Sequence, residues 1–379
     1  MNLRSLLGAR DLPVGVEIHA GGVRMLQARW GRRGGEVRAA CDSVVPTGDD
    51  GPESDARLRG LADAIEKGLT LGRFAGRSLA VGVDSRTVRV RSVRQTRLLD
   101  GDVTRAASLD APSRLGFTDS EGCEIGWLRA GEVRQGDEAR DELLYLGVRR
   151  EPVERLLGLL MDSGCRIVAV EPSFTALSRC ATRTLRRASD EQVCRVLVDI
   201  GAVTTDVMVT RGRSIAFYKQ LETGGASMTE LAAQRLGLDA ATVAELRQRR
   251  MLAGADASEP KVERAMFDAV RPLINDLAQE ITLCLRYYSV TFRGVRPEGV
   301  LVFGADAPEP KLAETIGEAL NLPVSVAKPL AGVDLSRVGH VIRAGDPASR
   351  WGACFGLSTR VLESPSARKA GEWKARAAA

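Results

Sequence analysis

The sequence predicts an α/β protein made of two related domains, and three observations support this fold class. A chain of 379 residues is too long for one ordinary hydrophobic core, so two domains are expected. Segments with strand and helix periodicity alternate along the chain. An apolar strand, a short glycine-containing loop and two more strands occur together twice, starting near Val14 and near Arg195. Such a duplication predicts two similar domains rather than one continuous sheet.

Composition argues against several classes of function. The net charge of +5 comes from 54 basic and 49 acidic residues, and aromatic residues make up only 4%, so a nucleic-acid-binding surface is not expected. No apolar run reaches the length of a membrane span. Seven cysteines without a CxxC pair predict reduced thiols in a cytoplasmic protein, not disulfides or a zinc site. Two histidines leave little material for a metal site or a Ser-His-Asp relay.

The first half of the chain begins with a strand meander and a capped helix. Strands are predicted at 14–18, 23–30 and 37–45. Ser54 is expected to cap a helix that ends near residue 71, because the apolar residues within it share one face. Further strands are predicted at 79–83, 87–95, 124–130, 142–149 and 166–170, and further helices at 102–115, 151–163 and 172–187.

The second half repeats the meander and adds a long helix. Pro272 lies inside the predicted helix 258–291, so a kink or a break is expected there. Leu3, Leu6 and Leu7 share a helical face and are predicted to form a packed or frayed end rather than a membrane foot. The other predicted elements are strands at 195–200, 205–210, 214–221, 299–303 and 324–327, and helices at 228–236, 240–249, 311–320 and 349–359.

The hairpin that opens the second domain is the better candidate for binding phosphate. Asp199 stands at a strand end, where its carboxylate could hold the waters of a magnesium ion. Gly201 permits the turn, and Thr204 and Thr205 offer hydroxyl and N–H groups to phosphate oxygens. The alternative interpretation is an ordinary β-turn with a surface acid.

The hairpin that opens the first domain is a weaker candidate. Gly21 and Gly22 allow close approach of the backbone, and Arg24 supplies positive charge. His19 stands where a close approach would favour glycine. It either contacts a phosphate or fills the space, and filling the space is the preferred interpretation.

Several motifs, taken in order, resemble the PilM family of type IV pilus assembly proteins, which is related to the cell-division protein FtsA. The resemblance covers roughly residues 13 to 360. It includes a Gly224-Gly225 pair at a helix start, which follows the candidate phosphate loop as in the family. The motifs are 199–205, 221–229, 171–179, 278–288, 300–305, 322–324 and 351–357.

The resemblance implies an α/β, actin-like (ribonuclease H-like) two-domain fold with an inserted small α+β subdomain. The implied parts are a first half of domain 1 at 13–77, the insertion at 78–169, a return to domain 1 at 170–192, domain 2 at 193–345, a closing helix at 346–361 and a disordered tail at 362–379. It also implies a cytoplasmic adaptor that binds the cytoplasmic tail of an inner-membrane partner, PilN, and so lies next to the inner membrane. Pilus motor components and self-association are further implied contacts.

The resemblance also implies ATP and magnesium as ligands. Glu17 and Asp199 take the catalytic positions, and Asp199 is the metal-binding carboxylate. Glu245 would bind a ribose hydroxyl. The other implied nucleotide-binding residues are Gly21, Gly22, Arg24, Gly201, Thr204, Thr205, Gly224, Gly225, Gly304 and Ala305.

Four departures from the family pattern predict weakened nucleotide binding. Glu17 replaces an Asp, His19 and Ala20 replace Gly and Ser, Asp306 adds negative charge to the adenosine loop, and Gln248 replaces a Lys, with Arg247 and Arg249 beside it. Each missing charged contact costs about 1.5–3 kcal/mol. Two alternatives therefore stay open: a weak nucleotide binder that is at most a slow ATPase, and a nucleotide-free scaffold.

Two other functions compete with the pilus adaptor. An adaptor of the type II secretion system would share the fold, but its usual members continue into a membrane helix. A superfamily enzyme, such as a sugar kinase or an exopolyphosphatase, would need a carboxylate base, for which Glu17 is the candidate. No sugar-binding signature supports the enzyme, so a non-catalytic adaptor is the preferred prediction.

Overall fold

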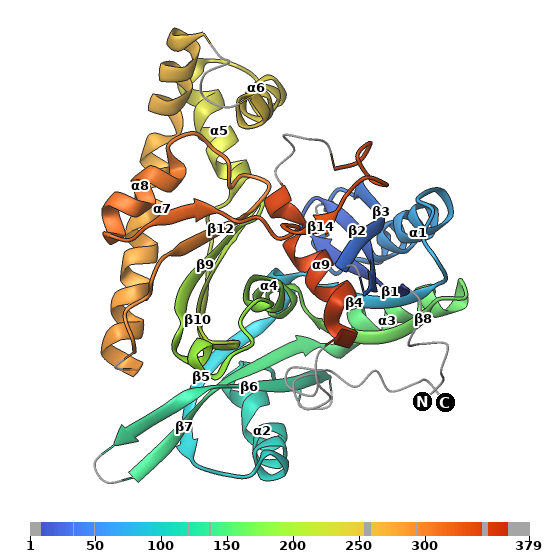
Figure 1. The fold of residues 1–379 in the computed structure, drawn as a ribbon, viewed down its shortest axis with the longest axis vertical. Helices are drawn as coiled ribbons and strands as arrows, with labels where there is room; N and C mark the ends of the chain where they lie inside the picture. The colour runs from blue at the N-terminus through green and yellow to red at the C-terminus, as the bar shows by residue number, and fades with distance from the viewer. Residues whose placement is uncertain are drawn as a thin grey trace. The chain divides into compact units, whose positions relative to one another are not determined.

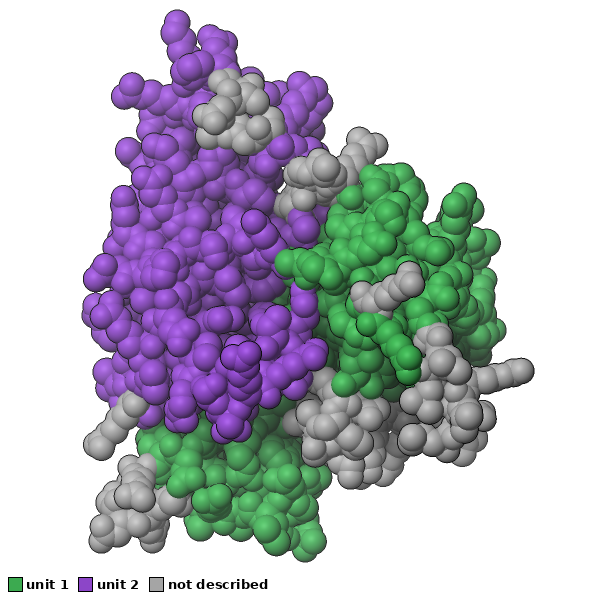
Figure 2. Space-filling view, in the orientation of Figure 1, with its two compact units in different colours: residues 1–180, 329–343, 351–379 green, residues 181–328, 344–350 purple. Residues whose placement is uncertain are grey.

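The computed structural model describes residues 9–32, 34–48, 50–119, 122–135, 138–253, 259–292, 294–342 and 348–362. The predictions for Leu3, Leu6, Leu7 and the tail from residue 363 lie outside these ranges. The chain forms two compact units (Figure 2). Unit 1 comprises residues 1–180, 329–343 and 351–379, and unit 2 comprises residues 181–328 and 344–350. Within the described ranges, no helix combines the length and the apolar character that crossing a membrane requires.

Unit 1 is built on a six-stranded sheet in which an antiparallel meander continues into parallel strands (Figure 1). Met25 and Leu26 are adjacent in β2 and point to opposite faces, and both are fully buried, so helices cover both faces of the sheet. The strand order is β14 (Val333–Asp334), β3 (Gly34–Val44), β2 (Gly22–Gly31), β1 (Arg10–His19), β4 (Ser78–Val83) and β8 (Arg166–Pro172).

The first helix of unit 1 follows its predicted cap and apolar stripe. Ser54 caps α1 (Asp55–Leu71), where its hydroxyl accepts a hydrogen bond from the Arg57 N–H. The predicted apolar face of α1 is buried, as expected, through Leu58, Leu61, Ile65 and Leu69. The other helices are α3 (Arg150–Asp162), α4 (Ser173–Thr182) and α9 (Gly352–Thr359), and α9 packs on β1, β2 and β4.

A three-stranded antiparallel sheet occupies the middle of the segment predicted as an insertion. Its order is β5 (Arg89–Thr96), β7 (Glu138–Arg149) and β6 (Cys123–Gln135), and α2 (Asp100–Arg114) packs on it through Val103 and Ala107. The ends of the segment 78–169 behave differently, because β4 and β8 pair within the six-stranded sheet. The subdomain boundaries themselves stay a prediction.

Unit 2 repeats the topology of unit 1. In its five-stranded sheet β9 is antiparallel to β10 and parallel to β12, just as β1 is antiparallel to β2 and parallel to β4. The duplication predicted from the two meanders is therefore confirmed. The order is β11 (Ser214–Leu221), β10 (Thr205–Arg211), β9 (Cys194–Ile200), β12 (Val300–Gly304) and β13 (Val324–Val326).

The long helix of unit 2 does not break at its proline. A kink or a break was expected at Pro272, and no break occurs, because α7 (Pro260–Phe292) continues through this residue (Figure 1). Pro272 has no N–H for the Asp268 carbonyl four residues earlier, and Arg235 donates to that carbonyl instead, at 3.3 Å. Burial of Ile274 and Leu277 holds the helix against the core. The other helices of this unit are α5 (Gly225–Leu236), α6 (Ala240–Ala253) and α8 (Leu312–Leu320).

Candidate functional site

The predicted phosphate loop of unit 2 is a tight turn tied to the start of α5. Gly201 N–H donates to the Thr204 carbonyl at 3.0 Å and closes the turn between β9 and β10. Thr205 is fully buried, and its hydroxyl donates to the Thr223 carbonyl at 2.6 Å. That hydroxyl is therefore used by the backbone of the following loop rather than presented to a ligand.

The first N–H groups of α5 are already engaged. Gly225 N–H donates to the Gly201 carbonyl at 2.9 Å, and Ala226 N–H donates to the Ala202 carbonyl at 2.8 Å. A Cβ on Gly224 would lie 2.6 Å from both of those carbonyl oxygens, so only glycine allows this approach. The two loops meet as a phosphate cradle requires, but these N–H groups bind carbonyls instead of an anion.

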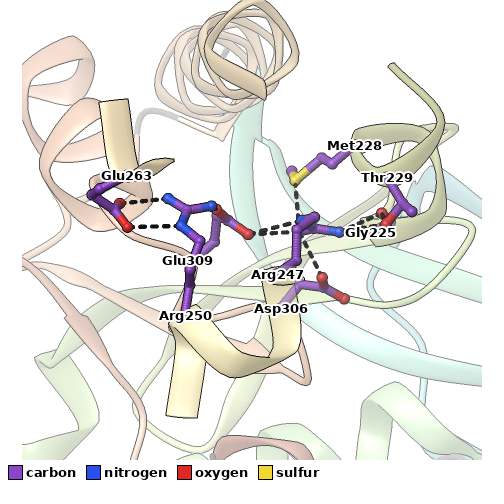
Figure 3. Close-up of polar contacts among 8 residues, drawn as sticks. All are labelled: Gly225, Met228, Thr229, Arg247, Arg250, Glu263, Asp306 and Glu309. Atoms are coloured by element: carbon purple, nitrogen blue, oxygen red, sulfur yellow. Dashed lines mark hydrogen bonds and ion pairs between the residues drawn. The ribbon is translucent and has the colours of Figure 1, made fainter. Parts of the chain in front are cut away.

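Arg247 of α6 fills the space beside this helix start (Figure 3). Its Nη1 donates to the Gly225 carbonyl at 2.7 Å and to the Thr229 hydroxyl at 2.8 Å. Its Nη2 donates to Asp306 at 2.8 Å, and its Nε donates to Glu309 at 2.9 Å. The Asp306 carboxylate in turn lies so close to Gly225 that a Cβ there would meet it at 2.1 Å.

A second arginine extends the network to α7. Arg250 donates to Glu309 at 3.0 Å and to Glu263 at 2.5 and 2.8 Å (Figure 3). Arg247, Arg250 and Glu309 are each only 2% exposed. Burial raises the pKa of the Asp306 carboxyl, although Arg247 opposes that rise. Lys311 lies near Glu263, so the three carboxylates are balanced by Arg247, Arg250 and Lys311, and the network offers a polyphosphate no net positive charge.

The candidate base of unit 1 is similarly occupied. Glu17 is buried and forms an ion pair with Arg24 at 3.3 Å, and the Cys354 thiol donates to Glu17 at 3.2 Å. Arg24 also pairs with Asp42 at 3.3 Å. Burial, reinforced by the charge of Glu17, raises the pKa of the Cys354 thiol well above its ordinary value. The predicted base and the predicted phosphate-binding cation thus neutralise each other.

His19 stabilises its own turn. Its Nδ1 accepts a hydrogen bond from the Gly21 N–H at 3.2 Å, which supports the space-filling interpretation of this residue. Gly22 has a φ of +152°, and a Cβ there would lie 2.0 Å from the Ser43 carbonyl oxygen. The neighbouring strand therefore explains this glycine.

Unit 1 also contains an apolar pocket that the sequence analysis did not identify, between α1, β4 and α3. The hollow spans about 500 Å³ when the adjoining open solvent is included, and only about 40 Å³ of it is cavity volume. The α1–α3 pocket has polar groups at its edge from Glu53, Arg57, Asp84 and Thr87. Its apolar lining is Ile18, Pro52, Leu58, Leu61, Val81, Val83, Pro152, Val153, Leu156 and Leu157.

Arg57 in the wall of this pocket has an unused donor. Its side chain is 3% exposed, and Nη2 donates to the carbonyls of His19 and Ala20 at 2.8 and 3.0 Å. The buried Nη1 finds no hydrogen-bond partner within the part of the chain that the structure describes. Asp84, the nearby carboxylate, is engaged by Arg86 at 2.6 Å. A buried guanidinium N–H without a partner is costly, so a ligand that accepts from it would be favoured.

The chain matches the family model described as type IV pilus assembly protein PilM over residues 15–358. This chain belongs to the PilM family. A solved structure described as a PilM–PilN type IV pilus biogenesis complex is 19% identical, with a TM-score of 0.76 over 93% of this chain and 99% of that one. The ethanolamine utilization protein EutJ from Carboxydothermus hydrogenoformans is 12% identical, with a TM-score of 0.52 over 94% and 93%. The predicted actin-like two-domain α/β fold is confirmed.

The structure gathers some of the nucleotide residues that PilM membership implies and separates others. Gly201, Gly224 and Gly225 lie together with Asp306, as described above. Glu245 lies instead on the exposed face of α6, where it pairs with Arg249 at 2.6 Å. The predicted roles of Asp199 in metal binding and of Glu245 in ribose binding stay predictions.

The segment that was predicted as an adenosine loop packs against the five-stranded sheet of unit 2. Gly304 has a φ of +101°, and a Cβ there would lie 2.1 Å from the Ile200 carbonyl oxygen. The close packing of this residue against β9 is therefore enough to require glycine, without any bound ligand. Ala305 follows and is partly buried. Among the described residues, no group of three or more His, Cys, Asp or Glu side chains could hold a metal ion. As they stand, the side chains around Gly225 do not fit the phosphates of a nucleotide.

Sequence reasoning noted Arg247 only as a neighbour of Gln248 and missed Arg250, Glu263 and Glu309. A signal was present, because Val243, Arg247 and Arg250 share one face of α6 at helical spacing. Arginines that continue an apolar stripe indicate buried ion pairs. Their partners could not be read from the same pattern.

Proposed function

We propose that this chain is a non-catalytic adaptor of type IV pilus assembly and that its α1–α3 pocket binds the cytoplasmic tail of a PilN-type inner-membrane partner. Membership of the PilM family supports the assembly role. The partner is suggested by the similar structure, which is described as a complex of PilM with PilN. The observation that carries the site is the pocket, with its apolar lining and the unused donor of Arg57.

The chemistry of the pocket favours an extended peptide with apolar side chains. Burying one Leu-sized side chain contributes about 1.5–3 kcal/mol. A hydrogen bond from the Arg57 guanidinium to a peptide carbonyl or carboxylate would contribute about 1.5–3 kcal/mol more. An extended segment supplies both groups, because its carbonyls recur along the backbone while alternate side chains point the same way. Together these terms would support a specific but reversible contact.

The adaptor role requires no chemical turnover. Glu17, the candidate base, is paired with Arg24 and accepts from the Cys354 thiol. ATP binding would be weak or absent in this proposal, and the partner would hold the protein at the inner membrane. Contacts with motor components and self-association stay predictions.

A labelled peptide that copies the cytoplasmic tail of a PilN-type protein tests the proposal by fluorescence anisotropy. Val153 lines the pocket and is not fully buried, so Val153→Glu places a charge there without opening the core. We expect the affinity to fall at least about 10-fold. Met161→Glu is the matched control, because Met161 lies on the same helix, is 43% exposed and is not part of the pocket lining.

A second pair of variants isolates the contribution of Arg57. Arg57→Met removes the unused donor, and we expect about a 10-fold loss of affinity. Arg59→Met is the control, because the Arg59 side chain is 70% exposed and pairs only weakly, at 3.6 Å, with Asp55. Failure of the unmodified protein to bind any PilN-type tail would refute the adaptor role. Unchanged binding by both pocket variants would refute the site.

A further inference from the structure

The elements of unit 2 that should surround a nucleotide meet instead on the Arg247 side chain. One guanidinium contacts α5 through the Gly225 carbonyl and the Thr229 hydroxyl, and it contacts the segment after β12 through Asp306 and Glu309 (Figure 3). All three of its nitrogens have partners within 2.9 Å. The arginine therefore makes contacts of the kind that a bound ligand would make between the same elements.

The charges of this network oppose a polyanion. The Asp306 carboxylate lies against Gly225 at the N-terminus of α5, the position that would otherwise attract a phosphate. Glu263 and Glu309 add two more carboxylates, against the two guanidinium groups of Arg247 and Arg250. Lys311 beside Glu263 brings the cluster to charge balance, so a triphosphate would meet the Asp306 carboxylate without any unpaired positive group to attract it.

Displacing the arginine is unfavourable for a second reason. Glu309 is 2% exposed and has ion-pair partners in Arg247 and Arg250. If Arg247 moved out to admit a ligand, Glu309 would lose one of its two ion-pair partners. Asp306 would lose the guanidinium that counteracts the effect of burial on its pKa. A nucleotide would compensate neither carboxylate, since its phosphates have the same sign of charge.

We propose that unit 2 works without a nucleotide and that the Arg247 guanidinium takes the nucleotide's place, clamping α5, α6 and the segment after β12. The excluded class is nucleoside di- and triphosphates with their magnesium ions. This inference is independent of the proposed adaptor role, because the network lies wholly within unit 2 and the α1–α3 pocket lies within unit 1. The shape of unit 2 is then set by the chain itself and not by nucleotide state.

The test combines a nucleotide titration with thermal unfolding of the full chain. The unmodified protein should give no saturable binding of MgATP or MgADP up to about 1 mM, and the midpoint of unfolding should shift by less than about 1 °C. Arg247→Met should lower the midpoint by about 10 °C without nucleotide, because two carboxylates lose a buried partner. Arg247→Lys should lower it by about 5 °C, since an ammonium cannot reproduce the fork of contacts.

Arg249→Met is the matched control. Arg249 lies two residues further along the same helix, its side chain is 72% exposed, and its pair with Glu245 is solvated, so the midpoint should change by about 1 °C or less. If Arg247 were instead a nucleotide contact, MgATP would stabilise the unmodified protein, and Arg247→Lys would lose that gain while keeping its midpoint without nucleotide. That pattern would overturn the proposal, as would saturable MgATP binding below about 1 mM. If Arg247→Met does not fold, Arg247→Lys decides between the two patterns.

Discussion

Glu171 of β8 is the shared partner of two buried arginines in unit 1. Its carboxylate is fully buried and accepts from Arg179 at 2.6 and 2.9 Å, from Arg360 at 2.7 Å and from the Thr175 hydroxyl at 2.8 Å. Because Arg360 follows α9 and Arg179 belongs to α4, one carboxylate links β8 to both helices. The stability of unit 1 should therefore depend on the charge of this group.

Glu171→Gln keeps the size of the side chain and removes the charge. The amide can accept at one position only, and its NH2 group would face an arginine donor. Leaving buried charges without their partner costs about 3–5 kcal/mol, and both arginine side chains are at most 10% exposed. We take about 3 kcal/mol as the expected loss at neutral pH. In the thermal midpoint this corresponds to about 6–12 °C.

The pH dependence gives an independent test with a definite sign. Burial alone would raise the pKa of Glu171, but the charges of Arg179 and Arg360 outweigh it and hold the pKa below the ordinary value of 4.5. A carboxyl with a lowered folded pKa contributes stability that is fully present above about 4.5 and is lost as pH falls through the folded pKa. The difference in stability between the unmodified protein and Glu171→Gln should therefore shrink below about pH 4.5.

Urea unfolding followed by tryptophan fluorescence suits this experiment. The tryptophans within the described residues, Trp30, Trp127 and Trp351, all belong to unit 1, so their signal reports the unit that contains Glu171. Glu151→Gln is the control, because the Glu151 side chain is 62% exposed and pairs with Arg155 on the surface of α3. A loss below about 1 kcal/mol at pH 7, or a difference that grows as the pH falls, would refute the reasoning.

Four further predictions concern two glycines, the carboxylate of Glu17 and the thiol of Cys41. Gly304→Ala should destabilise unit 2 by at least about 3 kcal/mol in urea unfolding followed by circular dichroism, because the left-handed backbone and the Ile200 carbonyl both exclude a Cβ. Gly225→Ala should cost a similar amount, about 3 kcal/mol, because the new methyl would push the Asp306 carboxylate out of its buried pair with Arg247, and a cost below about 1 kcal/mol would contradict this. Glu17→Gln should lower the stability of unit 1 by about 1–2 kcal/mol in tryptophan-detected unfolding, through loss of its buried arginine pair, and an unchanged midpoint would count against that pair. Cys41 is the one cysteine of seven that is not buried, so an aromatic disulfide reagent should titrate about one thiol in the native protein and none in Cys41→Ser.

Much of the fold was predictable because its signals are local. The two meanders are short apolar runs joined by glycine turns, and the structure places each at the corresponding position of a similar sheet. The start of α1 was readable from Ser54 and the spacing of the apolar residues that follow it. In each case the decisive contacts join residues a few positions apart, so neighbouring side chains suffice to specify the element.

Other features depended on partners that no local pattern could identify. The sequence predicted a kink or a break at Pro272, but the helix does not break, and Arg235 donates to the carbonyl that proline leaves without an N–H. The α1–α3 pocket was not predictable, since its lining comes from segments as far apart in the chain as Ile18 and Leu157.

The sequence by itself determined the duplicated α/β architecture and the glycine-rich turns, because turn and strand preferences act over a few residues. Only the tertiary structure decided which side chain occupies the space beside the start of α5 in unit 2. Arg247 reaches Gly225 and Glu309 across 22 and 62 positions of the chain. Whether an arginine on a helix is solvated or paired with buried carboxylates depends on how distant segments pack. Once such a pair is buried, separating it is strongly destabilising, because a buried charge is left without a partner.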